Sequence, residues 1–353
     1  MNGWFRLPLL ITANIMLAVS LYGGEVISLG NNRFRTAEQS LQTTLTPNAK
    51  VIINSALDLY GNLHIISDSS DRVTFVYKKI LKAPNLSTAM DYVDLINITM
   101  NSIPGGLQIL LQAPNPSPWA GQNFGAVEGE LHLPGNCQIE LALPYFGLSI
   151  DGPFRTVNSK PSFGRLEAKG ITEKLNLATT NQDIIVWDIG GDIAVSTANA
   201  DIRIYNMLCP LTAATIRNGN GNIYLSNVKG AVDIENSYGK IKLDRISLGG
   251  GKSRIIGSYG SLKLQLADLE RADLFMSNTN GDIEINIPDT VSAKFLLNVS
   301  SDGEIAAEGF KITPAQMDHN YLEFLSGTGE SQMTVEIKGD GNIFLKGIQC
   351  QKK

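Results

Sequence analysis

Two aspartates, Asp183 and Asp201, are the closest approach to an acid–base pair in the sequence. Each follows a turn-like segment, and neighbouring turns of a repeat would bring the two carboxylates to about 5 Å of each other. At that separation carboxylates perturb each other's pKa values, and enzymes that cleave polysaccharides use such pairs. Turns also favour Asp for its local hydrogen bonds, and no further base, acid or metal ligand accompanies this pair. We expect a turn role, with catalysis as the alternative.

A second set of residues precedes the same turns and has side chains suited to binding. Its members are Phe163, Asn181, Asn199, Asn220, Tyr238, Tyr259, Asn280 and Asp302. The two tyrosines are predicted to stack on neighbouring turns and to present aromatic faces to a sugar, while the asparagines supply hydrogen bonds. The alternative is that these residue types only cap the turns. Trp119, at the end of a proline-rich loop over residues 113–119, is a further candidate contact.

Other catalytic or cofactor motifs are missing from the sequence. His64, His132 and His319 are far apart along the chain, and none has a Cys, His or carboxylate at the spacing of a metal motif. There is no G-x-S-x-G nucleophile elbow, phosphate loop or dinucleotide fingerprint. The sequence therefore predicts no metal, no cofactor and no enzymatic activity.

The cysteines Cys137, Cys209 and Cys350 match no zinc-binding pattern, because their spacings are 72 and 141 residues. We expect them to be buried as small apolar residues. A disulfide between Cys137 and Cys209 is the alternative.

The element that positions the candidate residues is a repeat of 17–22 residues. Each copy is aligned on a turn residue, here called the anchor; the anchors are Gly147, Gly164, Gln182, Ala200, Gly221, Gly239, Gly260, Gly281, Gly303 and Gly341. From Gly164 onward, positions two and four after the anchor are all apolar, and those five and seven before the anchors are mostly so. The 38-residue gap before Gly341 predicts two repeats with a degenerate middle copy.

This alternation predicts an all-β fold in which each repeat contributes two short strands. We favour a β-helix-like solenoid of stacked two-stranded coils, because equivalent apolar columns are what stacking requires. Nine or ten coils would make a rod of roughly 45 Å. The alternative is an antiparallel meander or propeller, in which the same turns close hairpins.

The regions outside the repeats suggest the domain organisation. Residues 1–24 are predicted to be a signal peptide, with an uncleaved membrane anchor as the alternative. Residues 25–47 are expected to be a polar linker, 48–145 an N-terminal β region that caps the stack, and 146–348 the solenoid. A short helix is expected over residues 87–95, capped by Ser87 or Thr88. The polar tail, residues 349–353, is expected to cap the other end.

The overall composition agrees with a turn-rich β protein. Charged residues make up 18% of the chain, glycine occurs 34 times and the net charge is −5. A disordered chain would carry more charge, and a nucleic-acid-binding protein would carry a basic excess. We therefore expect no nucleic-acid partner.

The repeats resemble those of the bacterial putative adhesin family of β-strand-repeat domains. The resemblance is carried by residues 220–225, 236–243 and 277–285, and upstream by residues 127–134, and it extends over about residues 48–348. It implies adhesion and brings no catalytic residues or defined ligand.

Together these features predict an exported, non-enzymatic cell-envelope protein located in the periplasm, at the cell surface or outside the cell. Its expected partner is a glycan, another surface polymer or an envelope protein, with membrane contact only through the signal or an uncleaved anchor. The alternatives are a β-helical carbohydrate-active enzyme that uses Asp183 and Asp201, and a purely structural envelope component.

Overall fold

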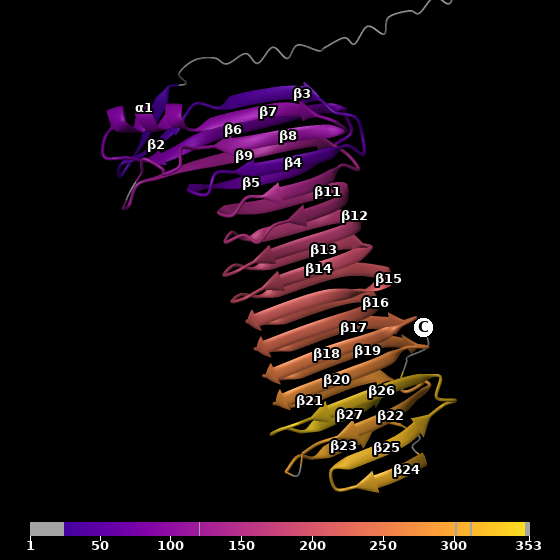
Figure 1. The fold of residues 1–353 in the computed structure, drawn as a ribbon. Coiled ribbons are helices and arrows are strands. Elements are labelled where there is room, and N and C mark those ends of the chain that lie inside the picture. The colour runs from indigo at the N-terminus through magenta and orange to yellow at the C-terminus, as the bar shows by residue number, and fades with distance from the viewer. Residues whose placement is uncertain (1–24, 120, 301, 311–312, 350–353) are drawn as a thin grey trace, which may run out of the picture.

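The computed structural model describes residues 25–119, 121–300, 302–310 and 313–349, so the predicted signal peptide and Cys350 lie outside it. The chain forms a long stack of strands with a broader N-terminal end (Figure 1). The stack has two strand layers, which we call the first and the second sheet. Strands that follow an anchor form the first sheet, and strands that precede the next anchor form the second.

Parallel strands build both sheets in the repeat region. In the first sheet these are β11 (Phe146–Ser159), β12 (Leu166–Thr179), β13 (Ile184–Gly190), β15 (Ile202–Asn220), β16 (Ile223–Tyr238), β17 (Ile241–Gly249), β19 (Leu262–Glu270), β21 (Ile283–Pro288), β27 (Ile343–Ile348) and β23 (Ile305–Glu308). The second sheet shares the long strands β11, β12, β15 and β16 and adds β14 (Asp192–Thr197), β18 (Lys252–Tyr259), β20 (Asp273–Asn280), β26 (Ser331–Ile337) and β22 (Ala293–Asn298). Parallel pairing confirms the coil and shows that the hairpin alternative is wrong for the repeats.

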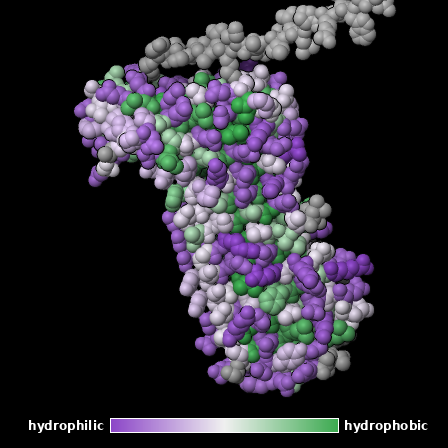
Figure 2. All heavy atoms as spheres, in the orientation of Figure 1, coloured by the Kyte–Doolittle hydropathy of each residue, from purple (hydrophilic) through white to green (hydrophobic). Residues whose placement is uncertain are grey.

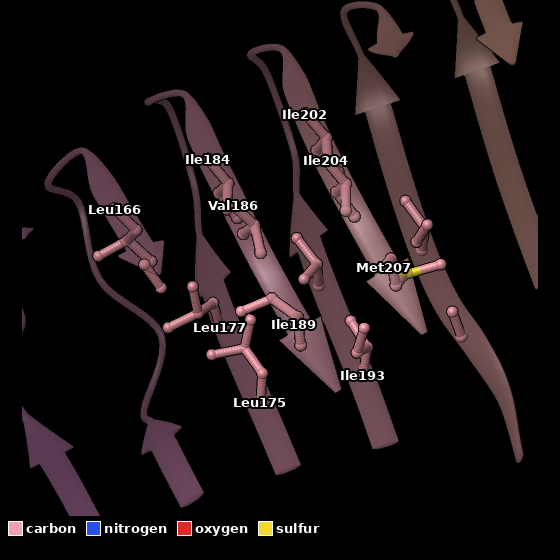
Figure 3. Packing of buried hydrophobic residues seen from close by; sticks show 14 of the residues in the cluster. Leu166, Leu175, Leu177, Ile184, Val186, Ile189, Ile193, Ile202, Ile204 and Met207 are labelled. Carbon is pink, nitrogen blue, oxygen red and sulfur yellow. The ribbon is translucent and has the colours of Figure 1, made fainter. Parts of the chain in front are cut away.

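The core lies between the two sheets and consists of the apolar columns predicted from the repeat. Ile184 pairs in register with Ile202, Ile202 pairs in turn with Ile223, and all three are buried. Across the core, Leu177 pairs with Val195 in the second sheet. Figure 3 shows such side chains from the two layers pointing toward one another. Burying each Ile or Leu contributes about 1.5–3 kcal/mol, so the repeated columns are a large source of stability.

The first anchor predicted from the sequence is wrong by one residue. Leu148 pairs with Leu166, which makes Phe146, and not Gly147, the equivalent of Gly164. Tyr145 therefore occupies the position before the anchor. Gly147 resembled an anchor because it is a glycine directly after the true anchor position, Phe146.

A bend within each coil depends on residues with left-handed backbone conformation. Asp188, Asn206 and Asn227 have φ values of 55°, 56° and 57°, a region that Asn and Asp tolerate better than most residues. Their side chains are linked from coil to coil: Asn206 Nδ2 donates to Asp188 Oδ1 at 2.9 Å, and Asn227 Nδ2 donates to Asn206 Oδ1 at 2.8 Å. This column gives Asp and Asn at the bend a structural role in three successive coils.

The coils at the C-terminal end are not stacked in sequence order. β26 and β27 pair with β20 and β21 on one side and with β22 and β23 on the other. The last segment of the chain therefore forms the penultimate coil. The predicted pair of sequential repeats across the 38-residue gap is wrong, because β25 (Tyr321–Ser326) and β24 (Thr313–Asp318) form an antiparallel extension of β22 before the chain returns.

The N-terminal end has the same kind of exchange. The coil formed by β4 (Lys50–Ser55) and β5 (Leu59–Asp68) lies between the coil of β10 (Gln138–Ala142) and β11 and the coil of β8 (Gly106–Gln112) and β9 (Phe124–Pro134). Antiparallel strands β6 (Arg72–Lys82) and β7 (Asn97–Ile103) then extend the two sheets. Antiparallel strands thus cover both ends, and the polar tail predicted as a cap lies, apart from Gln349, outside the described residues.

Residues 25–47 are not a linker. They contain β1 (Val26–Gly30), β2 (Arg33–Thr36) and β3 (Gln39–Thr44), with β2 and β3 both paired with β6. The segment looks like a linker in the sequence because the side chains of β3 alternate between half-buried and exposed. The one helix of the described residues, α1 (Leu86–Leu95), is capped by Asn85, whose side chain accepts from the N–H of Thr88 at 2.9 Å. The predicted helix is confirmed, and the predicted cap residues are wrong.

Cys137 and Cys209 are free and buried, as predicted from their isolation in the sequence, and the alternative disulfide is wrong. Burial raises the pKa of each thiol to about 11, so neither is a reactive thiolate at neutral pH.

Candidate functional site

The residues that precede the anchors form one continuous row along an edge of the stack. We call this the edge row; its members are Tyr60, Tyr145, Phe163, Asn181, Asn199, Asn220, Tyr238, Tyr259, Asn280 and Asp340. The sequence missed Tyr145 because of the shifted first anchor. It missed Tyr60 because the coil to which that residue belongs lies out of sequence order.

The N-terminal part of the edge row is a ladder of aromatic rings. Tyr145 stacks on Phe163 with ring centroids 5.2 Å apart and an interplanar angle of 12°. Tyr60 lies on the other side of Tyr145 with a centroid separation of 5.1 Å. Phe163 and Tyr60 are about half exposed, so this part of the row offers apolar ring edges to a ligand.

The middle of the edge row is a ladder of amides. Asn199 Nδ2 donates to Asn181 Oδ1 at 2.8 Å, and Asn220 Nδ2 donates to Asn199 Oδ1 at 2.8 Å. Each amide uses part of its hydrogen-bonding capacity within the ladder, and these exposed side chains keep further donors and acceptors for an external partner.

Tyr238 and Tyr259 stack as predicted, at 5.1 Å between ring centroids and an interplanar angle of 4°. The orientation differs from the sequence-based expectation, because the rings face each other along the stack. Their neighbours in register are Asn220 and Asn280, so the faces point along the row. The exposed surface, about half of each residue, therefore consists mainly of ring edges and hydroxyl groups. Asn280 continues the row, and its Oδ1 accepts from the N–H of Asp340 at 3.2 Å.

Trp119 is not a surface contact. Its side chain is buried, and its indole Nε1 donates to the carbonyl of Asp58 at 3.0 Å. The ring packs edge-on against Tyr92 at 5.7 Å. The proline-rich loop thus folds its tryptophan into the core of the N-terminal end, which the loop composition did not indicate.

Asp183 and Asp201 each lie two residues after a member of the edge row, and each accepts a hydrogen bond from the next coil. Asp183 Oδ1 accepts from the N–H of Asp201 at 3.1 Å, and Asp201 Oδ1 accepts from the N–H of Asn222 at 2.8 Å. Arg203 donates to both carboxylates, at 3.0 Å and 2.6 Å. Burial raises the pKa of Asp183, but the hydrogen bonds from Arg203 and from the Asp201 backbone outweigh it and leave the pKa lowered. A carboxyl held ionised in this way is poorly suited to be a general acid, and the geometry fits the turn role.

Buried polar side chains hold the turns from inside the core. Asn218 Nδ2 donates to the carbonyl of Ala200 at 2.9 Å, and Asn236 Nδ2 donates to that of Gly221 at 3.0 Å. Thr179 makes the equivalent bond to Gly164 at 3.0 Å. The carbonyls of these anchors are thus bound by side chains of the coil that follows.

A cluster of titratable residues that the sequence did not indicate lies near the N-terminal end. His64 and His132, which are far apart in the sequence, both contact Glu130, and His64 also contacts Asp151. They meet because β5, β9 and β11 are neighbours in the first sheet, where His64 pairs in register with Glu130. Only the out-of-order coil brings them together, so no sequence spacing could have revealed the cluster.

The surface between these features is largely polar. Hydrophilic side chains occur along the whole length of the face seen in Figure 2. Within the described ranges, no helix has the length and apolar character needed to span a membrane.

The chain is distantly similar to several solved structures and matches one family model. No curated protein matches the sequence. A crystal structure of a putative cell adhesion protein from Clostridium sporogenes is 11% identical with a TM-score of 0.24, and the alignment covers 88% of this chain and 100% of that one. For a putative adhesin from Bacteroides fragilis the identity is 11%, the TM-score 0.28 and the coverage 88% and 97%. A putative lipid binding protein from Parabacteroides distasonis is 9% identical, with a TM-score of 0.20 and coverage of 87% and 96%.

The family model of Toastrack DUF4097 matches residues 138–346, which is more than half of the chain and includes nearly all of the solenoid. The resemblance to β-strand-repeat adhesin domains drawn from the repeats is confirmed. This chain therefore belongs to the Toastrack DUF4097 family.

Proposed function

We propose that this protein is an exported, non-enzymatic scaffold of the cell envelope, in the periplasm, at the cell surface or outside the cell. Its edge row would bind an extended polymer, such as a glycan or another surface polymer, or a neighbouring envelope protein. The observation that carries this proposal is the register of the row: coil after coil adds one exposed polar or aromatic side chain to a single line.

The spacing of the edge row suits a polymer better than a small molecule. Strands in a sheet are about 4.8 Å apart, so the row repeats its hydrogen-bonding groups at that interval. Each contact is weak, but contacts along one polymer chain act together and raise the overall affinity. Removing single contacts should therefore weaken binding gradually.

The amide ladder gives a sharp test with a matched control. Asn199→Ala combined with Asn220→Ala removes two neighbouring amides of the edge row. The control is Asn158→Ala combined with Asn176→Ala, because these asparagines form an equivalent pair in the second sheet, with Asn176 Nδ2 donating to Asn158 Oδ1 at 2.9 Å. Both pairs link adjacent coils, so the two double variants should lose similar stability.

The assay is a binding screen of the intact protein against glycan arrays and bacterial cell surfaces. We expect the edge-row variant to bind its best ligand about tenfold more weakly, and the control variant to bind as the wild type does, since each neutral hydrogen bond contributes about 0.5–1.5 kcal/mol. Absence of binding at high micromolar concentration would instead support a purely structural component. Cleavage of a polysaccharide that is lost in Asp183→Asn combined with Asp201→Asn would overturn the non-enzymatic assignment.

A further inference from the structure

A second line of side chains crosses the outward face of the first sheet, further along the strands than the edge row. We call it the outer strip; its members, one each from β12, β13, β15, β16 and β17, are Lys169, Trp187, Tyr205, Tyr224 and Lys242. They point outward because their neighbours along each strand, such as Val186 and Ile204, face the core. Five adjacent strands make the strip about 19 Å long.

The centre of the outer strip consists of three aromatic rings in contact. Trp187 pairs in register with Tyr205, and their rings stack with centroids 6.1 Å apart and an interplanar angle of 15°. The ring of Tyr205 also contacts that of Tyr224, with a centroid separation of 5.5 Å and an angle of 54°. All three side chains are partly exposed, and among the described residues their polar atoms have no hydrogen-bond partner. The strip therefore offers apolar ring surface together with hydroxyl and indole groups.

An exposed lysine lies at each end of the three rings. Lys169 pairs in register with Trp187, and Lys242 pairs in register with Tyr224. The Nζ atom of Lys242 is 5.6 Å from the centre of the Tyr224 ring, which is a cation–π distance. Neither lysine forms an ion pair with another described residue. Positive charge therefore flanks the rings on both sides.

The carboxylates around the outer strip have other partners on the same face. Asp151 is in register with Lys169, and Asp244 lies two residues after Lys242, yet neither contacts a lysine. The observed pairs are Asp151 with His64, Glu167 with Arg165, Asp183 and Asp201 with Arg203, Asp244 with Arg245, and Glu284 with Lys263. Because these carboxylates are held elsewhere, Lys169 and Lys242 remain able to attract an external anion.

This combination fits a sugar chain that carries carboxylate groups. The C–H groups of a sugar ring can pack on Trp and Tyr side chains, whose polar atoms can bind its hydroxyl groups. Lysine ammonium groups attract carboxylates as flexible point charges. A specific protein partner would need about 800 Å² of surface on each side, and a strip one side chain wide offers less.

We propose that the outer strip binds an acidic polysaccharide, with sugar rings against Trp187, Tyr205 and Tyr224 and carboxylates beside Lys169 and Lys242. The bound segment would run along the stack, across the five strands of the strip. The edge row takes no part in this contact, so the inference does not rest on the function proposed above. It adds a second binding surface and specifies the charge of its ligand.

The test is calorimetric titration of the intact protein with oligomers of polygalacturonate, alginate and hyaluronate that are long enough to span the strip. Their methyl esters are the matched ligand controls, because they keep the sugar rings and linkages but lose the charge. We expect saturable binding of at least one acidic oligomer, and about tenfold weaker binding of its ester.

Two variants measure the two parts of the outer strip. Trp187→Ala should reduce the affinity for the acidic oligomer about tenfold. Lys169→Gln combined with Lys242→Gln should also reduce it about tenfold and leave the affinity for the ester unchanged. Lys174→Gln is the matched control, because this exposed lysine of β12 lies on the outward face of the second sheet, in register with Asp192.

Further measurements separate the outer strip from misfolding and from the edge row. The lysine double variant changes only exposed side chains, so it should unfold at the same urea concentration as the wild type. Asn199→Ala combined with Asn220→Ala should bind the acidic oligomer as the wild type does. A loss confined to this edge-row variant would overturn the proposal and leave the function of the edge row standing.

Four other results would each overturn the proposal. They are no saturable binding of any acidic oligomer, equal affinity for an acidic oligomer and its ester, unchanged binding in Trp187→Ala or in the lysine double variant, and an equal loss in Lys174→Gln.

Discussion

The anchor glycines give a direct measure of how tightly the coils are stacked. At Gly239 the backbone has φ of 125°, and a Cβ added there would lie 2.1 Å from the carbonyl oxygen of Gly221 in the preceding coil. Gly260 repeats this geometry against Gly239, at 2.2 Å. We therefore predict that Gly239→Ala strongly destabilises the protein.

The size of the effect follows from three costs. A non-glycine residue at such a φ costs about 1–3 kcal/mol. Relieving the overlap costs about 1–3 kcal/mol, since the contacting atom is backbone and cannot rotate away. Moving the coils of Gly221 and Gly239 apart also weakens the bond from the N–H of Gly221 to the carbonyl of Tyr238, 2.9 Å long, at about 1 kcal/mol. We expect a loss of about 3–7 kcal/mol in the free energy of unfolding, and weaker ligand binding because Tyr238 is displaced.

Gly250 provides the comparison. It also has positive φ, 69°, but a Cβ there would meet nothing within 4 Å. Gly250→Ala should therefore cost only the conformational term of about 1–2 kcal/mol. The assay is equilibrium unfolding in urea followed by circular dichroism and tryptophan fluorescence. Equal losses for the two variants would show that close stacking of the anchors does not determine stability.

Two further predictions concern the end of the stack and the acid limit of its stability. Removing residues 331–353 deletes β26 and β27 from between two other coils, so buried Val335, Ile343 and Leu345 no longer cover their neighbours. Size-exclusion chromatography of this variant should show aggregation, because the exposed strands can pair with other chains. Removing only residues 349–353 should leave a monodisperse protein with an unchanged unfolding temperature. Because the folded-state pKa of Asp183 is lowered, its ionised form stabilises the fold above the unfolded pKa of about 3.9, and this contribution disappears as the pH falls through the folded value. Asp183→Asn should therefore be less stable than the wild type at pH 6, with a difference that shrinks below about pH 4; a difference independent of pH would contradict this.

The repeated part of the fold could be predicted because stacking imposes the same requirement on every coil. Ile202, for example, has Ile184 and Ile223 as neighbours in register, so one column demands one residue type. The row before the anchors was found by the same logic, including the stacking of Tyr238 on Tyr259. The direction of the ring faces was not, because it depends on side-chain rotation rather than on spacing.

The order of the coils at the two ends could not be predicted. The strands of the penultimate coils have the same alternation of apolar and polar residues as the other strands. No feature of their own sequence shows which strands they pair with. Ile53, for example, has Leu141 on one side and Ile109 on the other, both distant in sequence. The contacts of His64 with Glu130 and Asp151 depend on this order, so they could not be predicted from the sequence either.

The exchange of coils at both ends also determines how the protein would respond to a pulling force. Force applied to the C-terminal residues reaches β27 first, and this strand is held by β21 on one side and β23 on the other. Extracting it requires both rows of hydrogen bonds to break together, whereas an edge strand would peel away from a single row. The N-terminal coil of β4 and β5 is held in the same way. Tension applied through the C-terminal residues would therefore meet a locked coil, and the stack would resist unravelling from that end.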